Sequence, residues 1–204
     1  MSERGKLITL EGVDGAGKST HIAFIADSLA TRGRHVVVTR EPGGTDLAER
    51  LRRMILEEPM EPLAETLLLL AARADHVSRV IRPALAAGTW IVCDRFSDAT
   101  AAYQGAGKGV PTQLIERLGD AAHPGLRPDR TLLFDCSYEV ASKRLAASGK
   151  ALDRFEREDR AFFERVRKAY LSLSLAEPER IRVIDAAAEL PKIRQALEHS
   201  LAFS

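Results

Sequence analysis

Eight consecutive residues near the N-terminus constrain the fold more than any other feature of the chain. They fit the pattern G-x-x-x-x-G-K-[ST] and read Gly12, Val13, Asp14, Gly15, Ala16, Gly17, Lys18 and Ser19. An apolar segment precedes this loop and a helical pattern follows it, the context in which backbone N–H groups and a helix N-terminus bind phosphate. The alternative, a chance match in a glycine-rich turn, does not explain that context. We therefore expect residues 12–20, with Thr20 as the last member, to bind the phosphates of ATP.

Two residues of the loop have expected chemical roles. Lys18 is expected to reach the β- and γ-phosphates, and Ser19 to bind Mg²⁺. Asp14 is a candidate either for magnesium or for orienting the acceptor of the phosphoryl group.

Short β-branched segments alternate with helical patterns along the whole chain. We expect strands at 6–12, 35–40, 89–94, 130–136 and 181–186. Helices are expected at 18–32, 45–57, 63–88, 137–147, 157–176 and 189–202, with one or two more before His123. The glycine-rich residues 105–109 are expected to form a turn. This alternation predicts an α/β fold, a five-stranded parallel sheet with helices on both faces, within a single domain over 1–204.

Polar residues gather where the expected strands end, and in parallel sheets ligands bind at that edge. Asp94 ends one strand and is a candidate ligand for Mg²⁺, with the N-cap of the next helix as the alternative. Arg40 and Arg95 follow two strand ends, and Arg73 lies in the long helical segment. Arginine donates paired hydrogen bonds to phosphate or to a base carbonyl. These positions predict a second, anion-binding half of the site beside the glycine-rich loop.

Composition narrows the possible partners and surroundings. The net charge of the 204 residues is +1, so no overall field attracts the chain to nucleic acid or membrane, and we expect neither as a partner. Cys93 and Cys136 lie in apolar segments and are expected to be buried, reduced thiols. The N-terminus does not resemble a signal peptide and no apolar run reaches membrane-spanning length, so a cytoplasmic location is expected.

Along nearly its whole length the chain resembles the thymidylate kinases, a family of P-loop nucleoside monophosphate kinases. The resemblance rests on the segments ITLEGVDGAGKST, TREPGGT, AAR, IRPALAAGTWIVCDRF, AYQGAGKG and LDRFE. It implies phosphorylation of dTMP to dTDP with MgATP, and a homodimer. It also implies that Arg40 and Arg95 hold the dTMP phosphate, that Arg73 faces the thymine carbonyl and that Thr100 lies near the base edge. Pro42 is expected to line the nucleoside pocket, and Tyr103, beside Gln104, to close over the deoxyribose.

The chain departs from the family pattern at Leu69, four positions before Arg73, where an aromatic residue often stacks on thymine. Aliphatic contact then replaces stacking there, unless another aromatic residue such as Phe96 compensates.

A short lid is expected at about 147–156, where a Ser-Gly pair separates two helical segments. The interior of the phosphate loop lacks positive charge besides Lys18, so phosphoryl transfer requires another cation. Arg154 matches the catalytic arginine of the family's lid, with Lys150 and Arg144 as alternatives. The catalytic residues are thus predicted to be Lys18, Asp14, Arg95 and Arg154. Another nucleoside monophosphate kinase and a nucleotide-dependent switch are the alternative functions; the guanine-reading motif N-K-x-D of many switches is absent.

Overall fold

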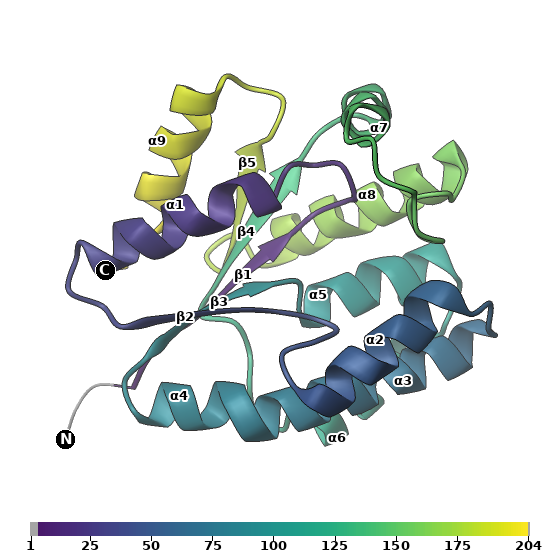
Figure 1. The fold of residues 1–204 in the computed structure, drawn as a ribbon, viewed down its shortest axis with the longest axis horizontal. Helices are drawn as coiled ribbons and strands as arrows, with labels where there is room; N and C mark the ends of the chain where they lie inside the picture. The colour runs from purple at the N-terminus through teal and green to yellow at the C-terminus, as the bar shows by residue number, and fades with distance from the viewer. Residues whose placement is uncertain (1–3, 204) are drawn as a thin grey trace.

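A computed structural model describes residues 4–203 and contains one five-stranded sheet (Figure 1). Its strands are β1 (Leu7–Glu11), β2 (Val36–Arg40), β3 (Trp90–Asp94), β4 (Arg130–Asp135) and β5 (Ile181–Asp185). The strands are all parallel, in the order β2-β3-β1-β4-β5. The predicted α/β fold is confirmed. The register sets Arg40 opposite Asp94 and Asp135 opposite Asp185, so the polar strand ends share one edge.

Helices cover both faces of the sheet. They are α1 (Ser19–Ala30), α2 (Asp46–Glu57), α3 (Pro62–His76), η1 (Val77–Ile81), α4 (Arg82–Ala86), α5 (Ser97–Thr100), η2 (Ala101–Gly107), α6 (Thr112–Ala122), α7 (Tyr138–Ala147), α8 (Arg160–Ala176) and α9 (Leu190–Ser200). In Figure 1, α1 and α9 lie on one side of the sheet, and α3, α4 and α6 on the other. The alternation of side chains along β1 explains both layers. Ile8 and Leu10 belong to the buried cluster that includes Ile25 of α1, whereas Leu7 packs in the cluster with Ile81.

The helical segment expected over 63–88 is helical, but its hydrogen-bonding pattern changes along its length. Between α3 and α4, η1 is a π-helical segment in which the Arg82 N–H bonds the Val77 carbonyl. Pro83 follows and has no N–H to donate, so a regular α-helical pattern cannot continue through it, and the wider π turn precedes it.

The prediction of a turn at residues 105–109 is wrong for residues 105–107, because η2 extends through Gly107. A Cβ atom at Gly107 would lie 2.6 Å from the Phe162 ring, so this glycine allows η2 to pack closely against α8. The helix ends at Gly107, and a turn follows at Lys108, before Gly109, whose φ is +76° and whose N–H bonds the Gly105 carbonyl. The expected helix at 157–176 begins at Arg160 instead, because the Asp159 side chain accepts the Phe162 N–H and caps it.

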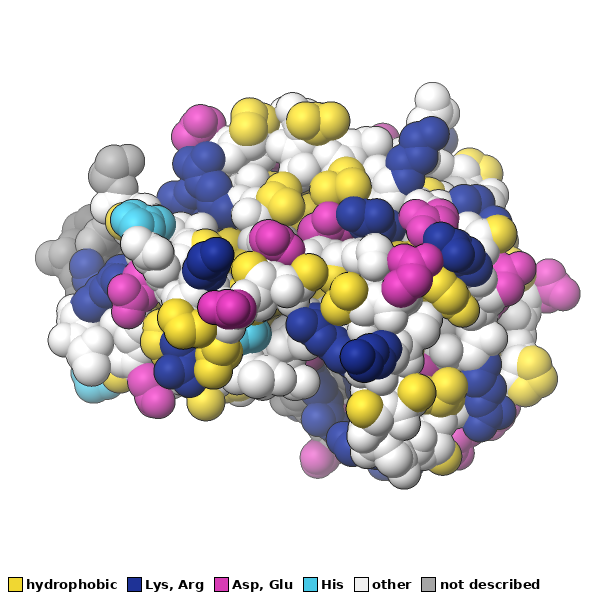
Figure 2. Space-filling view, turned by 90° about the horizontal axis from the view of Figure 1, so that it is seen from above, with side chains coloured by type: hydrophobic (Ala, Val, Ile, Leu, Met, Phe, Trp, Pro, Cys, Tyr) yellow, Lys and Arg dark blue, Asp and Glu magenta, His cyan; other side chains and the backbone are white. Residues whose placement is uncertain are grey.

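The surface and the thiols agree with the composition. On the face drawn in Figure 2, basic and acidic side chains are interspersed among apolar ones. Cys93 and Cys136 are free and buried, as expected. Among residues 4–203 we find no helix with the length and apolar character that crossing a membrane requires.

Candidate active site

The glycine-rich loop joins β1 to α1 and depends on backbone conformations that other residues rarely adopt. The φ angles of Gly12, Gly15 and Gly17 are +132°, +79° and +90°. A Cβ atom at Gly12 would lie 2.3 Å from the Phe134 carbonyl oxygen. Ser19 is the first residue of α1 and is exposed, as is Thr20. The loop therefore presents its backbone and the N-terminus of α1 at the sheet edge, where an anionic group is favoured.

Lys18 is buried against the same loop. Its Nζ atom donates to the Gly12 and Val13 carbonyl oxygens, each at 3.0 Å. Burial and the positive charge of Arg95 lower the Lys18 pKa to about 8. A phosphate bound beside this amine raises its pKa, because the negative charge stabilises the ammonium form that burial disfavours.

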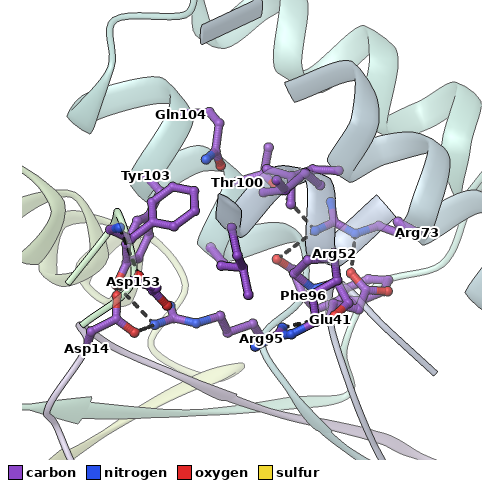
Figure 3. Close-up of a pocket in the computed structure, with 16 residues that line it drawn as sticks. Asp14, Glu41, Arg52, Arg73, Arg95, Phe96, Thr100, Tyr103, Gln104 and Asp153 are labelled. Atoms are coloured by element: carbon purple, nitrogen blue, oxygen red, sulfur yellow. Dashed lines mark hydrogen bonds and ion pairs between the residues drawn. The ribbon is translucent and has the colours of Figure 1, made fainter. Parts of the chain in front are cut away.

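Arg95 links the loop to the neighbouring pocket (Figure 3). Its Nη2 atom lies 2.5 Å from Asp14 Oδ1 and 3.0 Å from the Tyr103 hydroxyl, and the Tyr103 hydroxyl donates to Asp14 Oδ2 at 2.8 Å. Burial alone would lower the Arg95 pKa, but the charge of Asp14 and its neighbours raises it well above the usual value. For Asp14, burial alone would raise the pKa, but the positive charges of Arg95 and Lys18 outweigh burial, so the Asp14 pKa is lowered. Three predicted site residues thus form one charged, hydrogen-bonded group.

Arg73 occupies the other end of the pocket, on α3. Its Nη2 atom donates to the Phe96 carbonyl and to Thr100 Oγ1, each at 3.0 Å, and its Nε donates to Glu41 Oε2. Glu41 is a site residue that the sequence analysis missed, although it lies within TREPGG. Burial raises the Glu41 pKa, but the Arg73 charge and the hydrogen bond from His76 outweigh burial and lower it.

The pocket lies between Arg95 and Arg73. Its lining includes eight of the predicted residues, which are Asp14, Pro42, Leu69, Arg73, Arg95, Thr100, Tyr103 and Gln104. Phe96, named as a possible substitute for the missing stacking residue, also lines it, and the Arg73 guanidinium lies 5.0 Å from the Phe96 ring centre.

The side-chain placement of two arginines, Arg40 at the end of β2 and Arg52 on α2, was not predicted from the sequence. Arg40 lies outside the pocket lining, half exposed, and pairs with Glu49 of α2 at 3.0 Å. Arg52 of α2 lines the pocket, and its Nη1 atom donates to the Pro42 carbonyl at 3.0 Å. Nothing in the sequence marks Arg52, because it sits in an amphipathic helix beside Arg50 and Arg53.

The segment expected as a lid follows α7 and contains no helix between Ser148 and Asp159. Arg154 lies on the acceptor side, where its Nη2 atom bonds Glu65 and its Nε bonds the Ile55 carbonyl. Glu65 is buried and also accepts from Gln104 and Lys108, at 2.7 and 2.8 Å. Of the three candidate lid cations, Arg144 is the one that touches the glycine-rich loop, donating to the Ala16 carbonyl at 3.2 Å, whereas Lys150 is exposed.

The residues at the strand end suit a divalent cation bound together with phosphates. Asp94 Oδ1 is buried and has no hydrogen-bond partner among the described residues, which leaves it available to a cation or its water. The part of the chain that the structure describes contains no group of three or more His, Cys, Asp or Glu side chains placed to hold a metal. Mg²⁺ commonly binds through one or two protein oxygens and the substrate phosphates, so Asp94 and Ser19 fit that mode.

Comparison with known proteins gives a consistent result. The sequence model of the family described as Thymidylate kinase matches residues 10–197. Relatives named thymidylate kinase from Bordetella petrii and Cupriavidus necator are each 53% identical; the alignments cover 98% of this chain and 97% and 98% of those relatives. The crystal structure of thymidylate kinase from Ehrlichia chaffeensis aligns with a TM-score of 0.74 at 33% identity, over 89% of this chain and 93% of that one.

Proposed function

The chain belongs to the thymidylate kinase family, and we propose that it transfers the terminal phosphoryl group of ATP to dTMP through the residues described above. The observation that carries this proposal is the Arg95–Asp14 ion pair, which joins the glycine-rich loop to the pocket that ends at Arg73. A donor phosphate at the loop and an acceptor phosphate at Arg95 would then be neighbours.

On the donor side, the loop N–H groups and the N-terminus of α1 bind the phosphates. Lys18 exchanges its two carbonyl partners for phosphate oxygens and remains protonated beside them. Arg144 adds a second positive charge on the far side of the loop. A bound Mg²⁺, held by Ser19 and by Asp94 directly or through water, would neutralise charge on the transferring phosphoryl group.

On the acceptor side, Arg95 holds the dTMP phosphate, and Asp14 fixes the Arg95 side chain. Arg40 would join it only after leaving Glu49. Little covalent chemistry is needed, because aligned phosphates and neutralised charge lower the barrier to in-line transfer. Asp14 would also orient the attacking oxygen.

The rest of the pocket accounts for the choice of nucleoside. Arg73 and Thr100 present hydrogen-bonding groups suited to the edge of a base, while Leu69 supplies apolar contact. Tyr103 is buried, and its hydroxyl is already engaged by Asp14 and Arg95, so it offers no partner to a ribose 2′-hydroxyl. An unpaired buried hydroxyl costs roughly 1–3 kcal/mol, which favours deoxyribose.

The lid would supply the remaining positive charge. Arg154 bonds Glu65, so contact with the phosphates of ATP requires exchange of that partner. Residues 147–156 are therefore proposed as the moving segment.

The test is a set of reactions with MgATP and each nucleoside monophosphate, followed by measurement of ADP release. Release with dTMP far above the other acceptors supports the proposal. Preference for another monophosphate identifies a different kinase specificity, and nucleotide binding without ADP release favours a switch.

We further propose a homodimer formed through α2 and α3. Large apolar side chains on these two packed helices are 40–46% exposed, and they are Leu47, Met54, Leu63 and Leu67. Light scattering of the wild type and of Leu63→Glu tests the assembly, and a wild-type mass of one chain would contradict it. The cytoplasmic location stays a prediction.

A further inference from the structure

Arg95 sits at an unusual place in the backbone. It is the only non-glycine residue between 4 and 203 with a positive φ, +69°. That conformation is disfavoured for a side chain with a Cβ atom, so the surrounding structure has to hold it. The Arg95 N–H bonds the Leu10 carbonyl at 2.9 Å, which fixes the start of the turn to β1.

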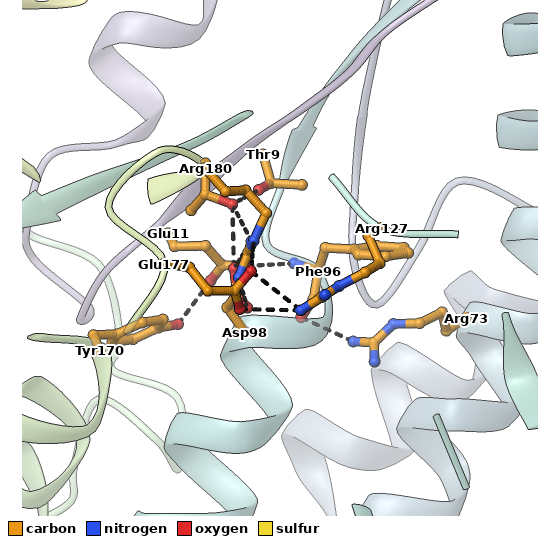
Figure 4. Close-up of polar contacts among 10 residues, drawn as sticks. Thr9, Glu11, Arg73, Phe96, Asp98, Arg127, Tyr170, Glu177 and Arg180 are labelled. Atoms are coloured by element: carbon orange, nitrogen blue, oxygen red, sulfur yellow. Dashed lines mark hydrogen bonds and ion pairs between the residues drawn. The ribbon is translucent and has the colours of Figure 1, made fainter. Parts of the chain in front are cut away.

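Glu11 holds the next peptide of the same turn (Figure 4). The Phe96 N–H donates to Glu11 Oε1 at 2.7 Å, and the Glu11 side chain is fully buried. Two residues further on, Asp98 is fixed by the guanidinium of Arg180, at 2.7 and 3.0 Å. The backbone that carries Arg95 is thus held by the Leu10 carbonyl at Arg95 itself and by side-chain contacts at Phe96 and Asp98 just after it.

The second oxygen of Glu11 acts on the Arg95 side chain through a tyrosine. The Tyr170 hydroxyl, on α8, donates to Glu11 Oε2 at 2.8 Å and accepts from Arg95 Nη1 at 3.3 Å. Tyr170 is 2% exposed and does not line the acceptor pocket. When Glu11 is ionised, the Tyr170 hydroxyl donates to it; when Glu11 is protonated, its O–H can donate to the Tyr170 oxygen. The link therefore persists in either protonation state of the carboxyl group.

We infer that Glu11 and Tyr170 form a positioning pair for Arg95: Glu11 secures the strained turn while Tyr170 fixes the guanidinium that meets the acceptor phosphate. This inference rests on the proposed function, because it assigns the pair to the acceptor half of that site. Neither residue touches substrate; both act through Arg95.

The pair is tested by measuring the dTMP dissociation constant by calorimetric titration, which needs no turnover, and the KM for ATP. Tyr170→Phe keeps the ring, which packs against Tyr103, and removes only the hydroxyl. We expect dTMP binding to weaken about tenfold or more, as for loss of one hydrogen bond to a charged group, with the ATP KM changed less than about twofold. Tyr138→Phe, on α7 and outside this network, controls for removal of a tyrosine hydroxyl and should leave both constants unchanged.

A double-mutant cycle separates positioning from packing. In an Arg95→Lys background the shorter reach of the ammonium breaks the bond to Tyr170, so Tyr170→Phe should have less than about a twofold further effect. The same fold-change in both backgrounds, or no change in the wild-type background, overturns the inference.

Glu11 supplies an independent test. Glu11→Gln retains an oxygen for the Phe96 N–H and an amide to bond Tyr170, so dTMP binding should stay within about twofold of wild type. Glu11→Leu has neither group and should weaken binding at least as much as Tyr170→Phe. If both variants melt like the wild type and lose dTMP affinity equally, the hydrogen bonds of Glu11 do not position Arg95, and the inference is overturned. If the wild-type protein binds no dTMP, the proposed acceptor is wrong, and the same comparison is made with the monophosphate it accepts.

Discussion

Arg73 and Glu41 form a buried ion pair in which Arg73 Nε lies 2.6 Å from Glu41 Oε2 and each side chain is 4% exposed. The other Glu41 oxygen is 3.0 Å from His76 Nδ1, and His76 Nε2 lies 2.8 Å from Thr39 Oγ1. The loop after β2 therefore orients an arginine of α3 that lines the pocket.

The pair predicts an effect of Glu41→Gln on both stability and binding. The neutral amide leaves Arg73 without a buried counter-charge, which should lower the free energy of unfolding by about 1–3 kcal/mol and weaken dTMP binding. Melting curves and titration with dTMP measure the two effects. Glu49→Gln removes the partner of Arg40 in a largely exposed pair and should change stability by less than about 1 kcal/mol. Equal effects of the two substitutions would show that burial of the Arg73 pair has no special role.

Lys18→Ala tests the donor side. Removing the amine deletes a charge contact to the transferring phosphates, and turnover should fall by about two or more orders of magnitude. The melting temperature should not fall, because the wild type buries an ammonium group against two carbonyl oxygens. Steady-state rates with dTMP and MgATP measure the loss. A variant with near-wild-type turnover contradicts the role given to the glycine-rich loop.

Much of the site could be predicted from the sequence because parallel strands end at one edge. The loop after β1, Arg95 after β3 and Glu41 and Pro42 after β2 all meet there. Once the resemblance assigned Arg73, Thr100 and Tyr103, the pocket contained them as expected.

The direction of individual side chains could not be predicted, since it depends on packing between helices. Arg40 turns toward Glu49 because α2 brings a carboxylate within 3.0 Å, and Arg52 faces the pocket because of the way α2 packs on α3. The pairing of Glu11 with Tyr170 joins residues 159 positions apart and has no signal in a single sequence.

Arg154 is predicted to act mainly in the transition state, although it bonds Glu65 in the structure. Arg154→Ala should lower kcat about tenfold or more with little change in the dTMP KM. Arg157→Ala, in the same segment, is the matched control for loss of an arginine. Steady-state kinetics decide between roles: a rise in dTMP KM with kcat preserved would mean that Arg154 only closes the acceptor pocket through Glu65.

Glu11 predicts a pH dependence of stability. Burial, together with the charge of Asp98, raises its pKa from 4.5 to about 8. Between these values the folded protein retains a proton that the unfolded chain has released, so the Glu11 contribution to stability decreases as pH rises from about 4.5 to 8. Glu11→Gln cannot titrate. The melting temperature of the wild type minus that of Glu11→Gln should therefore decrease between pH 5 and 8, by about 10 °C, and then level off. Parallel curves would show that Glu11 titrates normally.

Leu69 gives the sharpest test of how the base is bound. It lines the pocket one helical turn before Arg73, so both side chains face the same cavity. If Arg73 binds the base edge, Leu69 lies against the face of the ring. Leu69→Phe would add offset stacking worth roughly 0.5–1.5 kcal/mol beyond burial, and the dTMP dissociation constant should fall by up to about tenfold. Titration calorimetry measures this change.

Overpacking is the opposing effect of Leu69→Phe, because a larger side chain in a filled site costs roughly 1–3 kcal/mol. The two effects differ in the ligand-free protein: overpacking lowers its melting temperature, whereas stacking requires dTMP. Melting curves with and without dTMP therefore separate them. Leu175→Phe, at a side chain 83% exposed on α8, controls for the added aromatic ring and should change neither quantity. If Leu69→Phe also changes neither, Leu69 does not touch the base, and thymine does not lie between Leu69 and Arg73.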